Sequence, residues 1–486
     1  MKQAIVIGAG IAGIAASIRL AVKGYSVTVF EANAYPGGKL SEIQTEGYRF
    51  DAGPSLFTMP QYVDELFVLA GKQPRDYFNY QRLEKLCNYF YEDGTQLTAW
   101  SDSEKFAKEI ARKTTDTAQS VINFLKKSEK IYSITNHVFL EKSLHRLQTY
   151  LNTDTLKSLA QVAEIDSMRS MNKANESFFK DKRTVQLFNR YATYNGSNPY
   201  KAPATLNVIP HLEYHYGAYF PSGGMSAITQ SLVNLAKDCG VEFLYNMPVD
   251  EIVIDNKSVK GITARGTTFS SSVVVSNMDV WFTYKKLLQG QKAPERILGQ
   301  ERSSSALIFY WGIKAQFPQL DLHNIFFSQN YQKEFEFIWQ EGKIFSDPTV
   351  YVNISSKYKP DDAPDGCENW FVMINVPSNS GQDWDGLILE AKANILSKLR
   401  RVLGLDIASL IQCEEILDPR SIESKTASYQ GSLYGTSSND RFAAFLRHPN
   451  FSSKLKGLYF AGGSVHPGGG IPLALLSAKI VSGLVN

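Results

Sequence analysis

Short apolar runs and glycines alternate over the first thirty residues of the chain. Lys2–Ile7 (KQAIVI) and Tyr25–Phe30 (YSVTVF) are rich in β-branched residues, and a helical apolar pattern runs from Ile11 to Ala21 between them. β-Branched runs favour strands, and apolar residues that recur every three or four positions favour an amphipathic helix. The segment therefore predicts a strand, a helix and a second strand.

Three glycines lie between the first strand and the helix, in the order G-x-G-x-x-G at Gly8, Gly10 and Gly13. In such a turn the first glycine permits the tight bend, the second lets backbone N–H groups approach a pyrophosphate, and the third lets the helix pack close to the sheet. Glu31 ends the second strand, 18 residues after Gly13. A carboxylate at this place can accept hydrogen bonds from a ribose, so the segment predicts a dinucleotide-binding unit.

A second pair of glycines follows this acid. The two segments that contain these glycines are Gly37-Gly38-Lys39 and Asp51-Ala52-Gly53-Pro54. They suit a cofactor whose pyrophosphate and ribityl chain continue past the first turn. FAD is therefore favoured over NAD. The sequence has no second G-x-G-x-x-G between strands and no C-x-x-C pair, which argues against a separate NAD(P)H domain and against a disulfide reductase.

Glycine is again frequent near the C-terminus, where five of the nine residues from Gly462 to Gly470 are glycine. A strand pattern at 458–461 precedes them and a helical pattern at 472–484 follows. The loop also holds valine, histidine and proline, whereas a solvated linker would carry polar companions. We expect a loop packed against a planar ring, with the next helix directing its partial positive charge at the pyrimidine side of a flavin.

The rest of the chain mixes strands and helices. A hairpin is expected at 87–100 around Asp93-Gly94, and a helix from about residue 225 to 237 after Phe220-Pro-Ser-Gly-Gly. Short strands are expected within 241–276 and at 305–313, 349–354 and 369–376, and a helix at 387–403.

Residues 101–190 have a mainly helical pattern and carry 16 Lys and Arg against 11 Asp and Glu, a net of five positive charges. The segments 119–127 and 138–145 predict amphipathic helices. Such a layer suits either the surface of an anionic membrane or a soluble cap with a solvated face. The sequence has no unbroken run of 18 apolar residues, and its first apolar run is broken by glycines and reaches Arg19, so neither a spanning helix nor a signal peptide is expected.

Composition adds few constraints. A chain of 486 residues with 43% hydrophobic and 20% charged residues is typical of a globular protein of two or three domains. The formal charge of +3 and the absence of a long basic run give no reason to expect a nucleic-acid partner. Four cysteines without a C-x-x-C pair predict reduced thiols in a cytoplasmic protein, with no metal site.

Five stretches together resemble the bacterial carotenoid desaturases of the phytoene-desaturase type: VIGAGIAGIAASIRL, YPGGKL, YRFDAGPSLFTMP, YGAYFPSGGMSAI and LYFAGGSVHPGGGIPLALLSAKI. They occur in order over essentially the whole length, and the N-terminal third is most similar to the 1-hydroxycarotenoid 3,4-desaturase branch. The resemblance implies FAD-dependent formation of a C=C bond in a long polyene, with oxygen or a membrane quinone as terminal acceptor. It also implies peripheral attachment to the inner face of the cell membrane.

Three alternatives stay open. A phytoene desaturase shares these motifs. A flavin amine oxidase shares the glycine turn but usually has an acid soon after the C-terminal Ala-Gly pair, where this chain has Gly463-Ser464. A protein of the same fold that grips a lipid chain without flavin is the non-enzymatic alternative.

The expected fold class is α/β, with a Rossmann-like FAD-binding domain of the glutathione-reductase/amine-oxidase type. A substrate domain of antiparallel sheet plus helices is inserted into it. We predict that residues 1–85, 216–290 and 431–486 form the FAD-binding domain. Residues 86–215, which include the membrane-facing helices, and 291–430 are predicted to form the substrate domain.

The residues expected to bind FAD come from both glycine-rich ends and from a few positions between them. They are Gly8, Ala9, Gly10, Ile11, Ala12, Gly13, Glu31, Ala32, Gly37, Gly38, Lys39, Gly53, Pro54, Ser55, Val249, Gly462, Gly463, Gly470, Ile471 and Pro472.

A desaturation also releases a proton, and the flavin is expected to be the main catalyst. Candidate proton acceptors lie in His211-Leu-Glu-Tyr-His215, of which Glu213 and His215 are selected. His466 is expected to shape the flavin loop rather than to move a proton.

Overall fold

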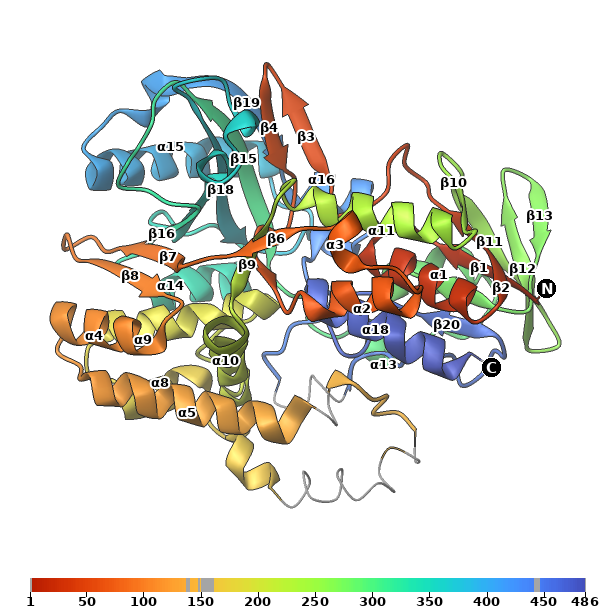
Figure 1. Ribbon diagram of the computed structural model, residues 1–486. Coiled ribbons are helices and arrows are strands. Elements are labelled where there is room, and N and C mark those ends of the chain that lie inside the picture. Colours follow the sequence, from red (N-terminus) through yellow and green to blue (C-terminus); the bar gives the residue numbers. More distant parts are fainter. Residues whose placement is uncertain (1, 137–139, 147–148, 150–160, 441–445, 486) are drawn as a thin grey trace.

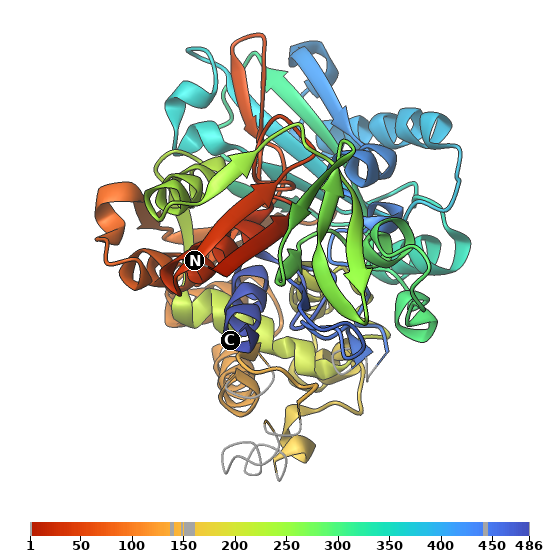
Figure 2. The same cartoon turned by 90° about the vertical axis from the view of Figure 1, so that its right-hand side faces the viewer.

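Five strands from distant parts of the chain form one parallel sheet, in the order β10-β2-β1-β14-β20. Their bounds are β1 Lys2–Ile7, β2 Tyr25–Phe30, β10 Glu242–Leu244, β14 Val274–Ser276 and β20 Leu458–Phe460. The computed structural model describes residues 2–136, 140–146, 149, 161–440 and 446–485. Figures 1 and 2 show this sheet beside the N-terminus.

Four helices pack together on one face of the parallel sheet: α1 (Ile11–Val22), α2 (Gln61–Leu69), α11 (Ser226–Asp238) and α18 (Ile471–Leu484). α1 is central, because its small apolar residues let both α11 and α18 approach it. Beyond the sheet lies an antiparallel meander of β11 (Val249–Asp255), β12 (Ser258–Ala264) and β13 (Thr267–Ser270). The first glycine turn thus lies between a sheet and a helical layer, as a Rossmann-like unit requires.

A second, mixed sheet of seven strands runs in the order β19-β15-β18-β17-β16-β7-β8. The bounds are β7 Lys85–Phe90, β8 Gln96–Trp100, β15 Ser305–Ile313, β16 His323–Phe326, β17 Val350–Asn353, β18 Glu368–Val376 and β19 Ile411–Leu417. Side chains alternate along β15: Leu307 and Phe309 join the core against α15 (Trp384–Leu403), whereas Ala306 and Ile308 line a large cavity. One face of this sheet is therefore core and the other is a cavity wall.

A helical layer lies below this sheet (Figure 1). It consists of α4 (Ser103–Lys113), α5 (Ala118–Thr135), α8 (Met171–Phe178) and α9 (Lys182–Asn189). Their core is aromatic and contains Phe106, Phe124, Phe179 and Phe188. A 3-10 turn, Arg190–Asn195, follows α9, and a π-helical turn, Leu212–Tyr216, follows α10 (Ile209–His211). Within the described ranges, no helix combines the length and the apolar character needed to cross a bilayer.

The remaining strands are short. β3 (Glu42–Thr45) pairs with β4 (Tyr48–Asp51), and β9 (Ala218–Pro221) pairs with β5 (Phe57–Thr58) and β6 (Tyr80–Arg82). In the part of the chain that the structure describes, the other α-helices are α3 Pro74–Tyr77, α12 Val280–Phe282, α13 Glu295–Leu298, α14 Tyr331–Glu336 and α16 Pro419–Thr426.

The predicted strands and helices agree with these bounds to within a few residues, with two exceptions. The helix predicted at 119–127 extends to Thr135 in α5. The predicted amphipathic helix at 138–145 lies partly outside the described residues, and residues 141–145 form turns, a bend and one irregular position. The helix prediction is wrong there because a tertiary contact fixes the backbone: His466 Nε2 donates to the Lys142 carbonyl over 2.9 Å, and His145 packs on His466. The bounds of the five predicted domain segments remain predictions.

Candidate active site

The turn from β1 to α1 is held by close backbone contacts. Gly8 has a φ of +95°, and its amide donates to the Phe30 carbonyl over 2.8 Å. A Cβ atom on Gly10 would lie 2.6 Å from the Asn277 Oδ1 atom, and one on Gly13 would overlap the Gly8 carbonyl. Only glycine fits the turn, and the N-terminus of α1 is left without a side-chain cap.

Glu31 follows β2 and ties this turn to the next segment. Its buried carboxylate accepts from the Ala9 amide over 2.7 Å and from the Asn33 amide over 2.8 Å. A carboxylate has about four lone-pair sites, so acceptor capacity remains for a ribose.

The second pair of glycines lies against the first turn. The Gly37 amide donates to the Ala9 carbonyl over 2.8 Å, and a Cβ atom on Gly53 would overlap the Lys39 carbonyl. The Lys39 ammonium donates to the carbonyls of Ser432 and Leu433 at 3.0 and 2.9 Å. Burial lowers the pKa of Lys39 to about 8.

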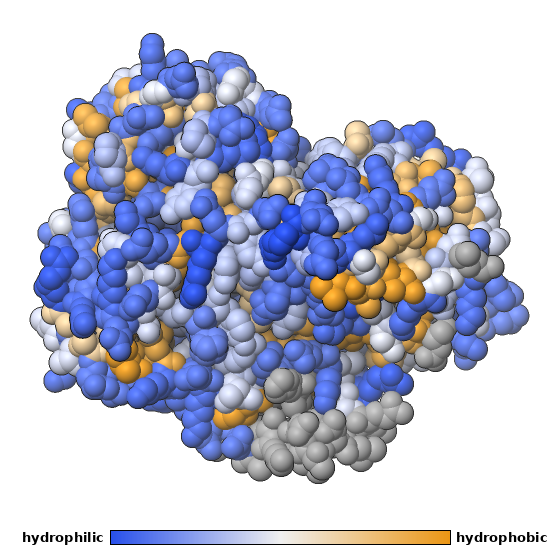
Figure 3. All heavy atoms as spheres, in the orientation of Figure 1, coloured by the Kyte–Doolittle hydropathy of each residue, from blue (hydrophilic) through white to orange (hydrophobic). Residues whose placement is uncertain are grey.

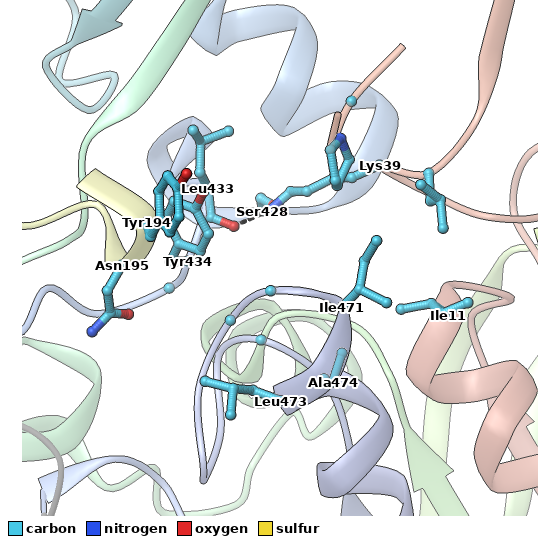
Figure 4. Close-up of a pocket in the computed structure, with 18 of the residues that line it drawn as sticks. Ile11, Lys39, Tyr194, Asn195, Ser428, Leu433, Tyr434, Ile471, Leu473 and Ala474 are labelled. Carbon is cyan, nitrogen blue, oxygen red and sulfur yellow. Dashed lines mark hydrogen bonds between the residues drawn. The ribbon is translucent and has the colours of Figure 1, made fainter. Parts of the chain in front are cut away.

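The C-terminal glycine loop closes the site from the other side. Gly462 has a φ of +119°, and its amide donates to Ser477 Oγ over 3.1 Å. Gly470, with a φ of +101°, precedes α18, whose N-terminus also lacks a side-chain cap. Figure 4 shows Ile471 beside Ile11, opposite Lys39 and Leu433. Two helix N-termini therefore border one cavity, and both favour negative charge there.

This cavity, of about 960 Å³, joins the two glycine-rich regions to the helical layer. All but two of the residues predicted to bind FAD line it; Ala9 and Gly13 support the turn from behind. Its volume lies in the range of cofactor and small-molecule sites.

The two predicted proton acceptors lie in different places. Glu213 is 1% exposed and lines the cavity, where its carboxylate lies 3.4 Å from an Arg190 nitrogen and accepts from Tyr194 Oη over 2.9 Å. Burial raises the pKa of Glu213, although the Arg190 charge opposes this. His215 is exposed, stacks on His211 and does not line the cavity. Of the two, the structure brings only Glu213 to the site.

Sequence reasoning missed several lining residues. Asn277, Met278 and Asp279 come directly after β14. Ligands bind where parallel strands end, so the VVVSNMD pattern was a usable signal. Tyr434 and the buried Arg447 also line the cavity, and Arg447 donates to the Tyr434 and Thr436 carbonyls at 3.2 and 2.9 Å; no motif marks them.

A sequence profile of flavin containing amine oxidoreductases matches residues 11–486. The chain belongs to this family. Three features of the site fit FAD. The glycine turn that excludes a Cβ, at the uncapped N-terminus of α1, suits the pyrophosphate. The uncapped N-terminus of α18 suits the ring, and Glu31 suits the ribose. The protein is an FAD-dependent oxidoreductase of the α/β fold expected for the family.

Curated relatives resemble the chain over its whole length. A 1-hydroxycarotenoid 3,4-desaturase of Flavobacterium sp. (strain P99-3) is 52% identical and covers 100% of this chain and 99% of the relative. A 4,4'-diapolycopene oxygenase of Methylomonas sp. is 34% identical, with coverage of 99% and 97%.

Among solved structures, cyclohexylamine oxidase from Brevibacterium oxydans IH-35A has a TM-score of 0.61, with 14% identity over 99% of this chain and 98% of that chain. This likeness confirms the predicted flavoenzyme fold.

Proposed function

We propose that this protein is a carotenoid desaturase that uses FAD to introduce a C=C bond into a long polyene, by 3,4-desaturation of a 1-hydroxycarotenoid. The full-length identity of 52% to a desaturase of that description supports the substrate class. The phytoene-desaturase alternative differs in substrate and not in fold.

The observation that carries this proposal is the course of the cavity. From the glycine-rich segments it continues between Ile308 and Phe371 of the seven-stranded sheet and apolar residues of the segments that connect α5 with β9. The latter are Leu140, Leu144, Ile165, Leu206, Ile209 and Leu212. A cavity with these apolar walls that starts at the cofactor segments suits a polyene, whose burial stabilises binding by about 25 cal/mol per Å².

In this proposal the N-terminal glycine turn and Glu31 hold the pyrophosphate and ribose, and the loop from Gly462 to Gly470 lies against the ring. FAD supplies the hydride acceptor when it is bound. The N-terminus of α18 stabilises negative charge on the ring side that it faces. The sheet and helical walls exclude water and orient the polyene.

Glu213 is the proposed proton acceptor. A carboxylate in a buried cavity wall with a raised pKa is a stronger base than one in water. The charge of Arg190 favours the ionised form of Glu213, and Tyr194 donates a hydrogen bond to its carboxylate. His215 has no part in this proposal, because it lies outside the cavity.

We also propose that the helical layer attaches the enzyme to the inner face of the cell membrane. Ser167 lines the cavity while the neighbouring Met168 is 74% exposed, so the cavity reaches the surface region of this basic layer. Lys126 and Lys173 are exposed there. A triple variant, K126Q/M168S/K173Q, should bind anionic liposomes more weakly than K292Q/K454Q, whose lysines are also exposed but lie elsewhere. Equal binding of both would remove this proposal.

The deciding experiment incubates FAD-loaded protein and liposomes with a 1-hydroxylated carotene or with phytoene, in air or anaerobically with a quinone. Products are separated by chromatography and weighed by mass spectrometry. Loss of two hydrogens from the hydroxylated substrate alone supports the proposal, and the condition that sustains turnover identifies the acceptor as oxygen or quinone. Stepwise desaturation of phytoene would favour that alternative, and oxidation of amines with peroxide release would favour an amine oxidase.

A further inference from the structure

One buried histidine on the apolar cavity wall has an unused hydrogen-bonding group. His323 begins β16, is 4% exposed and lines the cavity. Its Nδ1 atom lies 2.7 Å from Tyr351 Oη and 3.2 Å from Asn353 Nδ2. Its Nε2 atom is buried without a hydrogen-bond partner in the described part of the chain.

These contacts determine which ring nitrogen carries the proton. An amide nitrogen only donates, so Asn353 makes Nδ1 of His323 an acceptor. Burial lowers the pKa of His323 to about 4, and the ring is neutral at pH 7. The single proton is therefore on Nε2, which becomes a buried donor without an acceptor. Such a group is unfavourable unless a ligand oxygen accepts from it.

A charged pair on the same cavity wall supplies complementary groups. Arg190 and Glu213 both line the cavity, and the charge of Arg190 acts on His323. The rings of Tyr89, Tyr191 and Tyr194 surround the Arg190 guanidinium at 5.1, 4.3 and 5.2 Å from their centroids. A hydroxyl both accepts and donates, so it can accept from an imidazole N–H and donate to a carboxylate.

The position of His323 relative to the cofactor segments fits a hydroxyl near the reacting bond. Ser55, one of the residues proposed to contact FAD, lies 2.8 Å from Tyr351 Oη, which in turn contacts His323 Nδ1. His323 is thus two hydrogen bonds from the cofactor segment. In a substrate described as 1-hydroxy and 3,4-desaturated, the oxygen-bearing carbon is two carbons from the bond that becomes double. The hydroxyl site must therefore lie beside the redox site.

We propose that His323 determines substrate specificity by donating from Nε2 to the hydroxyl oxygen of the polyene, with the Arg190–Glu213 pair beside it. This inference rests on the proposed function and adds the group that selects a hydroxylated over an unsubstituted end. Tyr351 is a positioning residue, because it acts only through His323.

The test measures binding and turnover separately. FAD-loaded protein is titrated with a 1-hydroxylated carotene and with the same carotene lacking the hydroxyl, and the shift in polyene absorption gives each Kd. The wild type should prefer the hydroxylated polyene by about tenfold or more, the range of one good hydrogen bond to a buried donor. H323F should reduce the preference to below about threefold, whereas H323Q, which keeps an N–H donor, should retain most of it.

Y351F provides a second variant that keeps the shape of the wall, and it should weaken the preference about threefold. Flavin content and thermal unfolding identify any variant that is misfolded. An unchanged preference in folded H323F or Y351F, or no preference in the wild type, would overturn the inference.

Turnover of the same two polyenes distinguishes this inference from the proposed function. If the wild type binds with the expected preference but oxidises neither polyene, the proposed hydroxyl site is supported and the proposed desaturase function is rejected. If the wild type oxidises both polyenes equally and H323F alters neither rate, polyene desaturation is supported and the proposed hydroxyl site is rejected.

Discussion

A Cβ atom on Gly13 would overlap the carbonyl oxygen of Gly8. The Gly13→Ala variant must therefore open the turn that cradles the pyrophosphate. We expect it to lose most of its FAD and about 1–3 kcal/mol of stability. The flavin absorbance per mole of purified protein and urea unfolding measure the two effects.

Gly483, near the end of α18, is the matched control, because a Cβ atom there meets no atom within 4 Å. Gly483→Ala should keep its flavin and gain about 0.5–1 kcal/mol, since alanine is the better helix former. Equal flavin contents in both variants would show that the turn tolerates a methyl group.

Arg49 joins three acidic side chains and is the subject of a second prediction. Its guanidinium lies 3.0, 2.6 and 3.1 Å from Glu42, Asp51 and Asp362, and the arginine is 9% exposed. Arg49→Met removes the cation beside the buried Asp51 carboxylate, whereas Asp362 keeps Lys359 at 2.8 Å, and the loss should cost about 3–5 kcal/mol in urea unfolding. Arg420 is an exposed arginine with two acidic partners, and Arg420→Met should cost less than about 1 kcal/mol. Similar losses in both variants would contradict the prediction.

Glu213→Gln tests the proposed proton acceptor. Its amide fills the same space but is a very weak base, so turnover of the hydroxylated polyene should fall about 10²–10⁴-fold while FAD stays bound. The loss should persist across the pH profile, because the amide of glutamine does not titrate in this range. His215→Gln, at the exposed histidine two residues away, should leave turnover within about twofold of wild type. A Glu213→Gln enzyme with normal turnover would restrict this glutamate to a structural role.

Acid should weaken the fold through buried histidines. Burial lowers the pKa of His448 from 6.5 to about 4. Between pH 4 and pH 6.5 the histidine is therefore protonated in the unfolded chain and neutral in the folded chain. The free energy of unfolding contributed by His448 is thus full above pH 6.5 and falls as the pH drops toward 4. Glu334, whose pKa burial raises to about 7, acts in the opposite direction, so total stability does not isolate the histidine.

The comparison of wild type with His448→Gln isolates it. Their difference in unfolding free energy should shrink by up to about 3 kcal/mol between pH 7 and pH 4. A difference that does not change with pH would refute the assignment.

The cofactor segments can be recognised in the sequence because their backbone geometry requires particular residues. A turn that excludes a Cβ requires glycine, so Gly8, Gly10 and Gly13 are visible in the sequence. Glu31 is predictable because it ends a strand at a fixed spacing from that turn.

The rest of the site depends on contacts between distant segments, which leave no local pattern. His323 and Arg190 are 133 positions apart by their numbers. Arg190 lies over the ring of Tyr89 in β7, and β7 pairs with β16, which begins at His323, so both side chains line one cavity. Arg447 has no motif around it for the same reason. At 141–145 the local apolar pattern was misleading, because a contact with His466 replaced the expected helix.

The order of strands in the parallel sheet also determines when the enzyme can take up its cofactor. β1 and β2 are complete early in synthesis, but β20 and α18 leave the ribosome more than 400 residues after the first glycine turn. Until then the nascent chain offers a cradle for the pyrophosphate without the loop that lies against the ring. Firm uptake of FAD therefore waits for β20 and α18, and until they fold one wall of the cavity stays open.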